Sequence, residues 1–298
     1  MECGGLDAAL DRIRPQLRTP DSAKAPAPIR FAGALHLVRF FLPFIILTFI
    51  SGTAHAQQPF STDDADVTEK KKVHLEISNE FDILQRSTYP ALRQNTLVFA
   101  LNYGLVDGVE IGVDYPFITI SNSRIAPTHQ FSGFGDLDFH VKYNFLKERA
   151  GSWHPALTAT LAVELPTGDA ARGLGSGFKD FALNSIAQKS ITDKTKVRVN
   201  GGIVFAGSTA TGDIGIRTRG RVFVAGVSLV RQFTEKLDLG VEVIGAKSGS
   251  LKASLAARQT MVGGNYQVTP RMSFDFGVVA GNFNSPRVGV LVGISLDF

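Results

Sequence analysis

Apolar and polar residues alternate strictly through most of the chain after residue 72. Successive side chains of a β-strand point to opposite faces, so an alternating segment indicates a strand with one apolar face. The clearest case is the C-terminal stretch RVGVLVGISLDF, in which every second residue is apolar up to Phe298. No segment beyond residue 72 sustains the helical spacing of apolar residues. The chain is therefore expected to be all-β.

The alternation divides the chain into about twelve expected strands joined by connections of two kinds. The expected strands are 73–83, 95–103, 108–117, 134–146, 155–166, 180–191, 196–207, 220–233, 236–246, 253–268, 271–283 and 287–298. Connections after the second, sixth, eighth and tenth strands are short, whereas those after the first, third, fifth and seventh are long and polar. This pattern predicts an antiparallel transmembrane β-barrel. A secreted β-sandwich, the alternative, does not predict the asymmetry of the connections.

The most hydrophobic run of the sequence lies near the N-terminus. Its apolar core, Phe40–Ile50, has eleven residues, which as a helix would reach about 16 Å, well short of the ~30 Å of a bilayer core. Arginines precede this core and Ala54-His55-Ala56 follows it, as in a secretory signal peptide cleaved after Ala56. We expect three parts: a signal peptide with a long lead (1–56), a periplasmic lead-in (57–72) and an outer-membrane β-barrel (73–298).

Charge and cysteine content exclude some function classes. The only cysteine, Cys3, falls in the expected signal peptide, so the mature chain has no disulfide and no thiol chemistry. The full chain has 31 Lys+Arg and 27 Asp+Glu; residues 1–56 hold six and four of these, which leaves 25 and 23 in the mature chain. No basic stripe accompanies this near balance, and we expect no nucleic-acid partner.

The end of the chain indicates a destination and a partner. A final phenylalanine in phase with apolar residues resembles the C-terminus of bacterial outer-membrane proteins, where it implies recognition by the barrel-assembly machinery. We therefore interpret Phe298 as an assembly signal. The expected location is the bacterial outer membrane, with lipid as a partner and the barrel as a monomer.

Charged residues recur on the polar faces of the expected strands. The candidates for a lumen or selectivity site are Glu110, Asp114, Asp136, Asp138, His140, Lys142, Glu164 and Arg198. They fit either a charged constriction that selects solutes or a network that stiffens the lumen. The sequence shows no pair of histidines at positions i and i+2 and no E-x-x-H motif. We expect neither catalysis, nor a metal, nor a cofactor.

Three stretches carry a family resemblance. GFGDLDFHVKYNFL (133–146), LAVELPTGD (161–169) and GLGSGFKDF (173–181) are similar to the outer-membrane transporter-like family associated with the meta-cleavage pathway of phenol degradation. The resemblance implies an outer-membrane barrel that takes up aromatic or other hydrophobic solutes, and it supplies no substrate-binding residues. We predict a channel or transporter for small solutes. The alternatives are a structural or surface-interaction barrel with a plugged lumen and, third, a barrel-type lipid enzyme.

Overall fold

The computed structural model describes residues 59–86, 92–121, 130–149, 151–206, 220–248, 255–283 and 285–298. The chain divides into the units Met1–Ile50 and Ser51–Phe298. The first unit and the signal peptide expected over 1–56 lie outside the described residues. Within the described ranges, no helix is long and apolar enough to cross a membrane.

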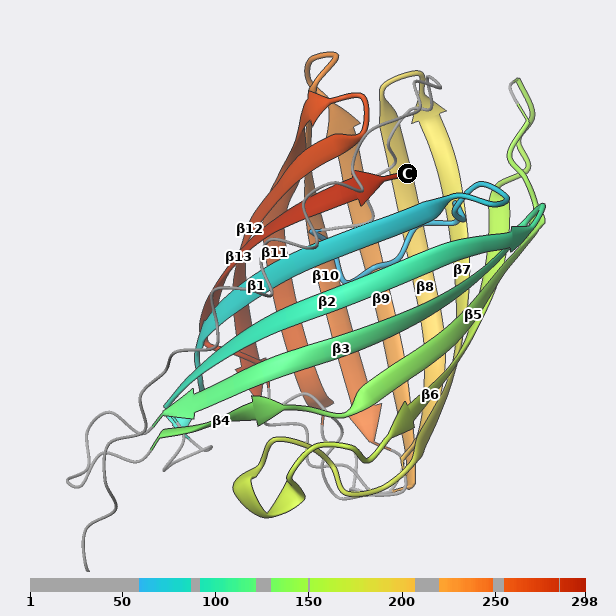
Figure 1. The fold of residues 1–298 in the computed structure, drawn as a ribbon. Helices are drawn as coiled ribbons and strands as arrows, with labels where there is room; N and C mark the ends of the chain where they lie inside the picture. Colours follow the sequence, from blue (N-terminus) through green and yellow to red (C-terminus); the bar gives the residue numbers. More distant parts are fainter. Residues whose placement is uncertain are drawn as a thin grey trace, which may run out of the picture. The chain divides into compact units, whose positions relative to one another are not determined.

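Antiparallel strands close into one barrel (Figure 1). The strands are β1 (Val73–Ile83), β2 (Arg93–Val106), β3 (Val109–Ser121), β4 (Gln130–Phe134), β5 (Leu137–Leu146), β6 (Ala156–Leu165), β7 (Asp180–Thr192), β8 (Thr195–Ala206), β9 (Gly220–Gln232), β10 (Leu237–Ser248), β11 (Leu255–Thr269), β12 (Met272–Phe283) and β13 (Val288–Asp297), with a short 3-10 helix at Ala170–Arg172. Closure comes from the pairing of β1 with β13. It joins the first strand to the last, so neither of these two is left as an open edge to the lipid.

The wall has twelve strand positions, although the described residues form thirteen strands, because β4 and β5 share one position. Both pair with β3, β4 opposite Phe117–Ser121 and β5 opposite Val109–Asp114. The sequence pattern predicted one strand over 134–146, and the structure instead breaks it at Gly135-Asp136. The break has a tertiary cause, since the Asp136 carboxylate turns toward a distant loop, as described below.

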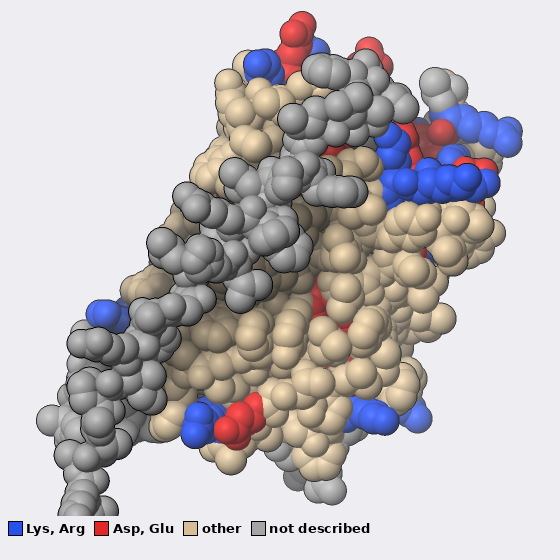
Figure 2. Space-filling view, in the orientation of Figure 1, with Lys and Arg blue, Asp and Glu red and all other residues tan. Residues whose placement is uncertain are grey.

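The outward face of the wall is apolar. On β13, Val288, Val290, Val292 and Ile294 are 40–48% exposed, whereas the intervening Gly289, Leu291 and Gly293 are buried. The phase predicted for the final strand is therefore confirmed. In Figure 2, blue and red atoms gather at the two ends of the visible face, and a mostly tan band lies between them. Such a band is the lipid-facing surface of a transmembrane barrel.

The two rims of the barrel differ. Tight connections join β2 to β3 at Asp107-Gly108, β7 to β8 at Asp193-Lys194, and β11 to β12 at Pro270-Arg271. Gly108 adopts a positive φ of 81°, which its turn requires. We call this rim the turn end, and the chain terminus at Phe298 lies there (Figure 1). The predicted asymmetry of the connections is thus present.

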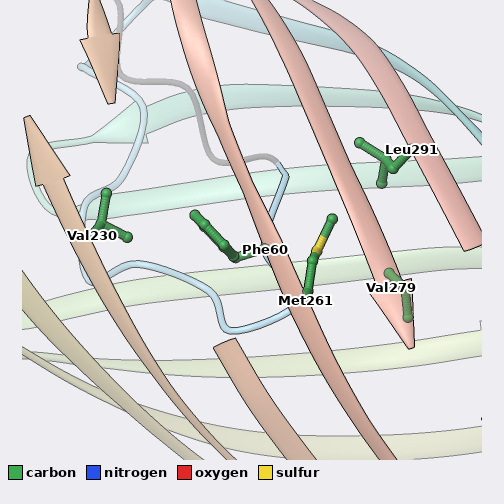
Figure 3. Close-up of a cluster of buried hydrophobic side chains, with 5 residues drawn as sticks. All are labelled: Phe60, Val230, Met261, Val279 and Leu291. Carbon is green, nitrogen blue, oxygen red and sulfur yellow. The ribbon is translucent and has the colours of Figure 1, made fainter. Parts of the chain in front are cut away.

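One cluster of buried apolar side chains includes a residue that precedes the first strand. Phe60 is 6% exposed and clusters with Val230, Met261, Val279 and Leu291, which project inward from four strands (Figure 3). The chain before β1 therefore enters the lumen.

Candidate functional site

The lumen is crossed by residues 59–68, which we call the lumen segment. The sequence pattern predicted a periplasmic lead-in over 57–72; the structure instead places its residues 59–68 among the inward-facing side chains of the barrel, and residues 69–71 are exposed. Backbone polar groups away from water need partners, and this segment has no ladder of its own inside the barrel. The wall supplies them.

Three wall positions hold the backbone of the lumen segment. On β10, the Glu242 carboxylate accepts hydrogen bonds from the backbone N–H and from the hydroxyl of Thr62, the latter at 2.5 Å. On the opposite side, Glu110 of β3 accepts from the N–H and hydroxyl of Thr68, both at 2.6 Å. Between them, the carbonyl oxygen of Ala65 accepts from Asn144 Nδ2 at 2.7 Å and Thr158 Oγ1 at 2.6 Å. The segment is thus fixed across the lumen.

Ion pairs reinforce this attachment. Lys142 is 1% exposed, and its Nζ lies 2.9 Å from Asp63 Oδ1 and 3.3 Å from Asp64 Oδ1. Arg198 Nη2 lies 3.6 Å from the other oxygen of Asp64. Burial raises the pKa of Asp64, but the two cations outweigh that effect and hold its pKa below the ordinary value. Asp64 is therefore an anion that bridges β5 and β8.

A polar cavity of about 400 Å³ remains between the lumen segment and one side of the wall. It opens at the turn end, since residues of the β7–β8 and β9–β10 turns line it. Its charged lining residues are Asp64, Asp66, Asp193, Lys194, Lys196, Arg198, Glu235, Lys236 and Asp238. Near the turn end, the lumen segment therefore narrows the lumen without filling it completely.

Carboxylates form a row across four adjacent strands. Asp114 of β3 is registered with Asp138 of β5, Asp138 with Glu164 of β6, and Glu164 with Asp180 of β7. His140 lies beside the start of this row, with its Nδ1 3.8 Å from Asp138 Oδ1. Like charges directly opposite one another destabilise a sheet. The row therefore lowers the stability of the folded barrel, which suggests that these carboxylates serve a function.

Asp136 belongs to a different arrangement. Its Oδ1 accepts a hydrogen bond from Gly168 N at 2.9 Å, and its Oδ2 accepts one from Ser176 N at 2.5 Å. A Cβ added to Gly175 would lie 2.4 Å from Oδ1 of the same carboxylate. The three stretches that carry the family resemblance therefore meet at one carboxylate, which fastens the loop after β6 to the break between β4 and β5.

The structure groups the predicted site residues into three sets. The lumen segment is held by Glu110, Lys142 and Arg198. The acidic row includes Asp114, Asp138 and Glu164, and His140 lies beside it. The loop after β6 is anchored by Asp136. Sequence reasoning missed the partners in the lumen segment, namely Thr62, Asp63, Asp64 and Thr68. Their only signal was the polar, acidic stretch STDDAD at 61–66.

Comparisons with known proteins agree with the architecture. Residues 62–298 match the sequence profile of a family described as "Putative MetA-pathway of phenol degradation". Among curated protein sequences, a search finds no match.

Solved structures with a similar fold are bacterial outer-membrane barrels. An outer-membrane channel from Pseudomonas putida F1 is 14% identical with a TM-score of 0.56, over 81% of this chain and 99% of that one. The KdgM porin is 10% identical with a TM-score of 0.51, over 76% and 99%. The NanC porin is 8% identical with a TM-score of 0.51, over 74% and 98%. The closed barrel and its apolar outer band thus place the protein in the bacterial outer membrane.

Proposed function

The chain belongs to this family associated with phenol degradation, and we propose that it is a channel for small solutes. The observation that carries the proposal is a closed barrel with a polar inner face, in which the lumen segment leaves a polar cavity of about 400 Å³. Twelve strands lie between the ~8 whose interior side chains can fill and the ~16 of an open porin. The expected passage is therefore narrow.

Two features govern passage in this proposal. The lumen segment sets the free cross-section, because it is anchored on β3, β5, β8 and β10. The acidic row sets the charge preference, since Asp138 and Glu164 face one another across β5 and β6. The description of the family names a phenol-degradation pathway. Phenol and related small aromatics are therefore the first solutes to test.

A second candidate is a barrel with a plugged lumen that serves a structural or surface-interaction role. The observation that favours it is the number of anchors, which include two buried cations, Lys142 and Arg198, paired with Asp64. In this alternative the segment is a permanent part of the core, and the loops opposite the turn end carry the function.

An enzymatic role has less support. Lipid hydrolysis by a barrel needs a nucleophile activated by a base at the lipid-facing surface. In the part of the chain that the structure describes, His74 and His140 face inward, and His154 lies in the connection after β5. We propose that the protein is not an enzyme.

Conductance of the folded barrel in planar bilayers tests the channel. We would compare the mature chain with Thr62→Val/Glu242→Gln, which weakens one anchor, and with a deletion of residues 57–68. The expected result is a small conductance that rises several-fold in the deletion variant and rises less in the double variant. Heat-modifiable migration on gels would confirm that each barrel is folded. If no folded form conducts ions or admits phenol in liposome-swelling assays, the plugged alternative replaces the channel.

We also propose that the protein is exported by a signal peptide ending at Ala56, that the barrel-assembly machinery recognises Phe298, and that the barrel is a monomer. The motives are the short apolar core before Ala56 and the outward position of Phe298, which is 52% exposed. Mass spectrometry of protein extracted from the membrane should find Gln57 at the N-terminus. Native mass spectrometry of the same sample should find one chain per barrel.

A further inference from the structure

Three metal-ligand side chains converge at the junction of β3 and β5, where the acidic row begins. They are Asp114, Asp138 and His140, whose ligand atoms all lie within 4.8 Å of one another. His140 Nδ1 is 3.9 Å from Asp114 Oδ2 and 3.8 Å from Asp138 Oδ1. One imidazole nitrogen therefore faces two carboxylate oxygens that come from neighbouring strands.

These spacings suit a small divalent ion. Bonds from Zn²⁺ to imidazole nitrogen and carboxylate oxygen are each about 2.0–2.2 Å, so two ligand atoms lie roughly 3.4 Å apart at a tetrahedral angle and about 4.2 Å apart at most. The separations of 3.8 and 3.9 Å fall inside that range. All three ligand atoms lie within 4.8 Å of one another, so the two carboxylates would draw in toward the imidazole when the ion binds.

A second observation concerns the other ring nitrogen. Oε1 of Glu110, a residue that is 0% exposed, has no hydrogen-bond partner among the described residues and lies 3.9 Å from His140 Nε2. Its Oε2 accepts two hydrogen bonds from Thr68, which fixes the carboxylate in place. Metal-ligating histidines commonly donate their second N–H to a carboxylate, which orients the ring. Glu110 Oε1 faces that nitrogen from 3.9 Å and would take this role once the two atoms approach to hydrogen-bond distance.

The backbone leaves room for this ring at Gly112. A Cβ at that position would lie 2.3 Å from His140 Nε2 and 2.2 Å from Oδ1 of Asn102, a buried oxygen that also has no hydrogen-bond partner in the described part of the chain. Any side chain at 112 would therefore displace the imidazole from its place between the carboxylates.

The balance of charge around His140 also favours a bound cation. Glu110, Asp114 and Asp138 surround His140, and together they exceed the single positive charge that a protonated imidazole can supply. Lys142 is the next residue of β5 that faces the lumen. Its charge does not offset these carboxylates, because it is paired with Asp63 and Asp64 of the lumen segment. A divalent cation would balance this excess.

We propose that Asp114, Asp138 and His140 bind a divalent transition-metal ion, with Zn²⁺ the best fit, and that Glu110 orients the imidazole. A mixed set of imidazole and carboxylates suits Zn²⁺ better than Mg²⁺. Because β3 and β5 share only the six registered pairs from Val109–Tyr143 to Asp114–Asp138, the ion would tie together a short strand pairing. The proposal does not depend on transport.

Zn²⁺ binding to the folded, chelator-treated mature protein in detergent tests the site, with a chromophoric chelator as competitor and Mg²⁺ as the comparison ion. We expect one Zn²⁺ per barrel, at least 100-fold weaker binding in His140→Gln and Asp138→Asn, and binding 10- to 100-fold weaker in Glu110→Gln. Gly112→Ala should weaken binding as well. The matched control is His154→Gln, which removes an exposed histidine from the connection after β5 and should leave binding unchanged.

Thermal unfolding gives a readout that does not rely on the competitor. Zn²⁺ should raise the unfolding midpoint of the wild type and of His154→Gln, and should not raise that of His140→Gln. Absence of Zn²⁺ binding by the folded wild type, or undiminished binding by folded His140→Gln, would overturn the proposal.

Discussion

His74 Nδ1 lies 2.6 Å from Asp297 Oδ1, and this pair joins the first strand of the barrel to the last. The two residues are directly registered across β1 and β13. The other ring nitrogen, Nε2, lies 2.8 Å from Glu76 Oε1, so the imidazole is held on both sides. His74 is 3% exposed, which makes this contact a buried polar link at the closure of the barrel.

Asp297→Asn is expected to weaken barrel closure. It removes the charge from a hydrogen bond to a buried imidazole, and such charge-assisted bonds contribute about 1.5–3 kcal/mol. The midpoint of thermal unfolding, followed by heat-modifiable migration, should fall. Lys70→Gln is the control, because Lys70 and Asp107 form an exposed pair at 3.9 Å of a kind that contributes little. Equal midpoints for Asp297→Asn and Lys70→Gln would contradict the role assigned to His74 and Asp297.

Val292→Arg should impair assembly, whereas Gly293→Ala should be tolerated. Val292 is 42% exposed on the apolar outer face, and an arginine near mid-bilayer costs about 2–4 kcal/mol there. A Cβ at Gly293 would meet Ser78 Cβ at 3.3 Å, a tight contact that a small shift relieves. The yield of folded barrel in outer-membrane fractions measures the difference. Similar yields from the two variants would mean that the phase of β13 does not decide assembly.

Much of the barrel could be predicted from the sequence because lipid and lumen impose opposite polarity on alternate residues. The outward position of Val292 and the inward position of Lys142 follow from that constraint, and the tight turn at Asp193-Lys194 follows from the short polar connection between two alternating segments. Such features depend on local pattern alone.

The lumen segment could not be predicted, since the interior of this barrel is polar. Thr62 and Asp64 are each no more than 2% exposed, yet their composition is that of a solvated linker. Partners such as Glu242 lie some 180 residues away in sequence. The break before β5 was missed for a similar reason, because it depends on the contact of Asp136 with Ser176 rather than on its own alternation.

Asp136→Asn should loosen the loop after β6. The substitution removes the charge from two hydrogen bonds, to Gly168 N and Ser176 N, and turns one acceptor atom into a donor. Gly175→Ala should act in the same way, since its Cβ would clash with the carboxylate. Limited proteolysis and hydrogen exchange over residues 166–179 should rise in both variants. Asp169→Asn, which keeps a side-chain oxygen able to cap the 3-10 helix, should behave like wild type.

Glu148 should make the turn end sensitive to acid. Burial raises the pKa of Glu148, but hydrogen bonds from Lys189 and Ser190 outweigh that effect and hold the pKa below its ordinary value of 4.5. A carboxyl group with a lowered pKa stabilises the folded state above its ordinary pKa, and this contribution is lost as pH falls through the folded-state pKa.

Hydrogen exchange of the connection between β5 and β6 measures this effect. Glu148→Gln should exchange faster than wild type at pH 7, and the difference should shrink as the pH falls below 4.5, the ordinary pKa. Glu235→Gln, in the exposed turn between β9 and β10, is the matched control. If the difference in exchange rate between wild type and Glu148→Gln does not depend on pH, the ionised carboxylate is not its cause.

Neutralising the acidic row should lower the cation preference of the channel. Asp138 and Glu164 are cross-strand neighbours on the inner face of the wall, and charges in a narrow lumen are screened less than charges on a surface. Reversal potentials in planar bilayers, recorded with a chelator present, should shift toward lower cation selectivity in Asp138→Asn/Glu164→Gln. The shift should diminish at molar salt, where the Debye length is about 3 Å. Asp169→Asn is the internal comparison: it removes a negative charge from an exposed carboxylate of the loop after β6, so its selectivity should stay near that of wild type. If Asp169→Asn changes selectivity as much as the double variant, the constriction lies at the loop and not along the row.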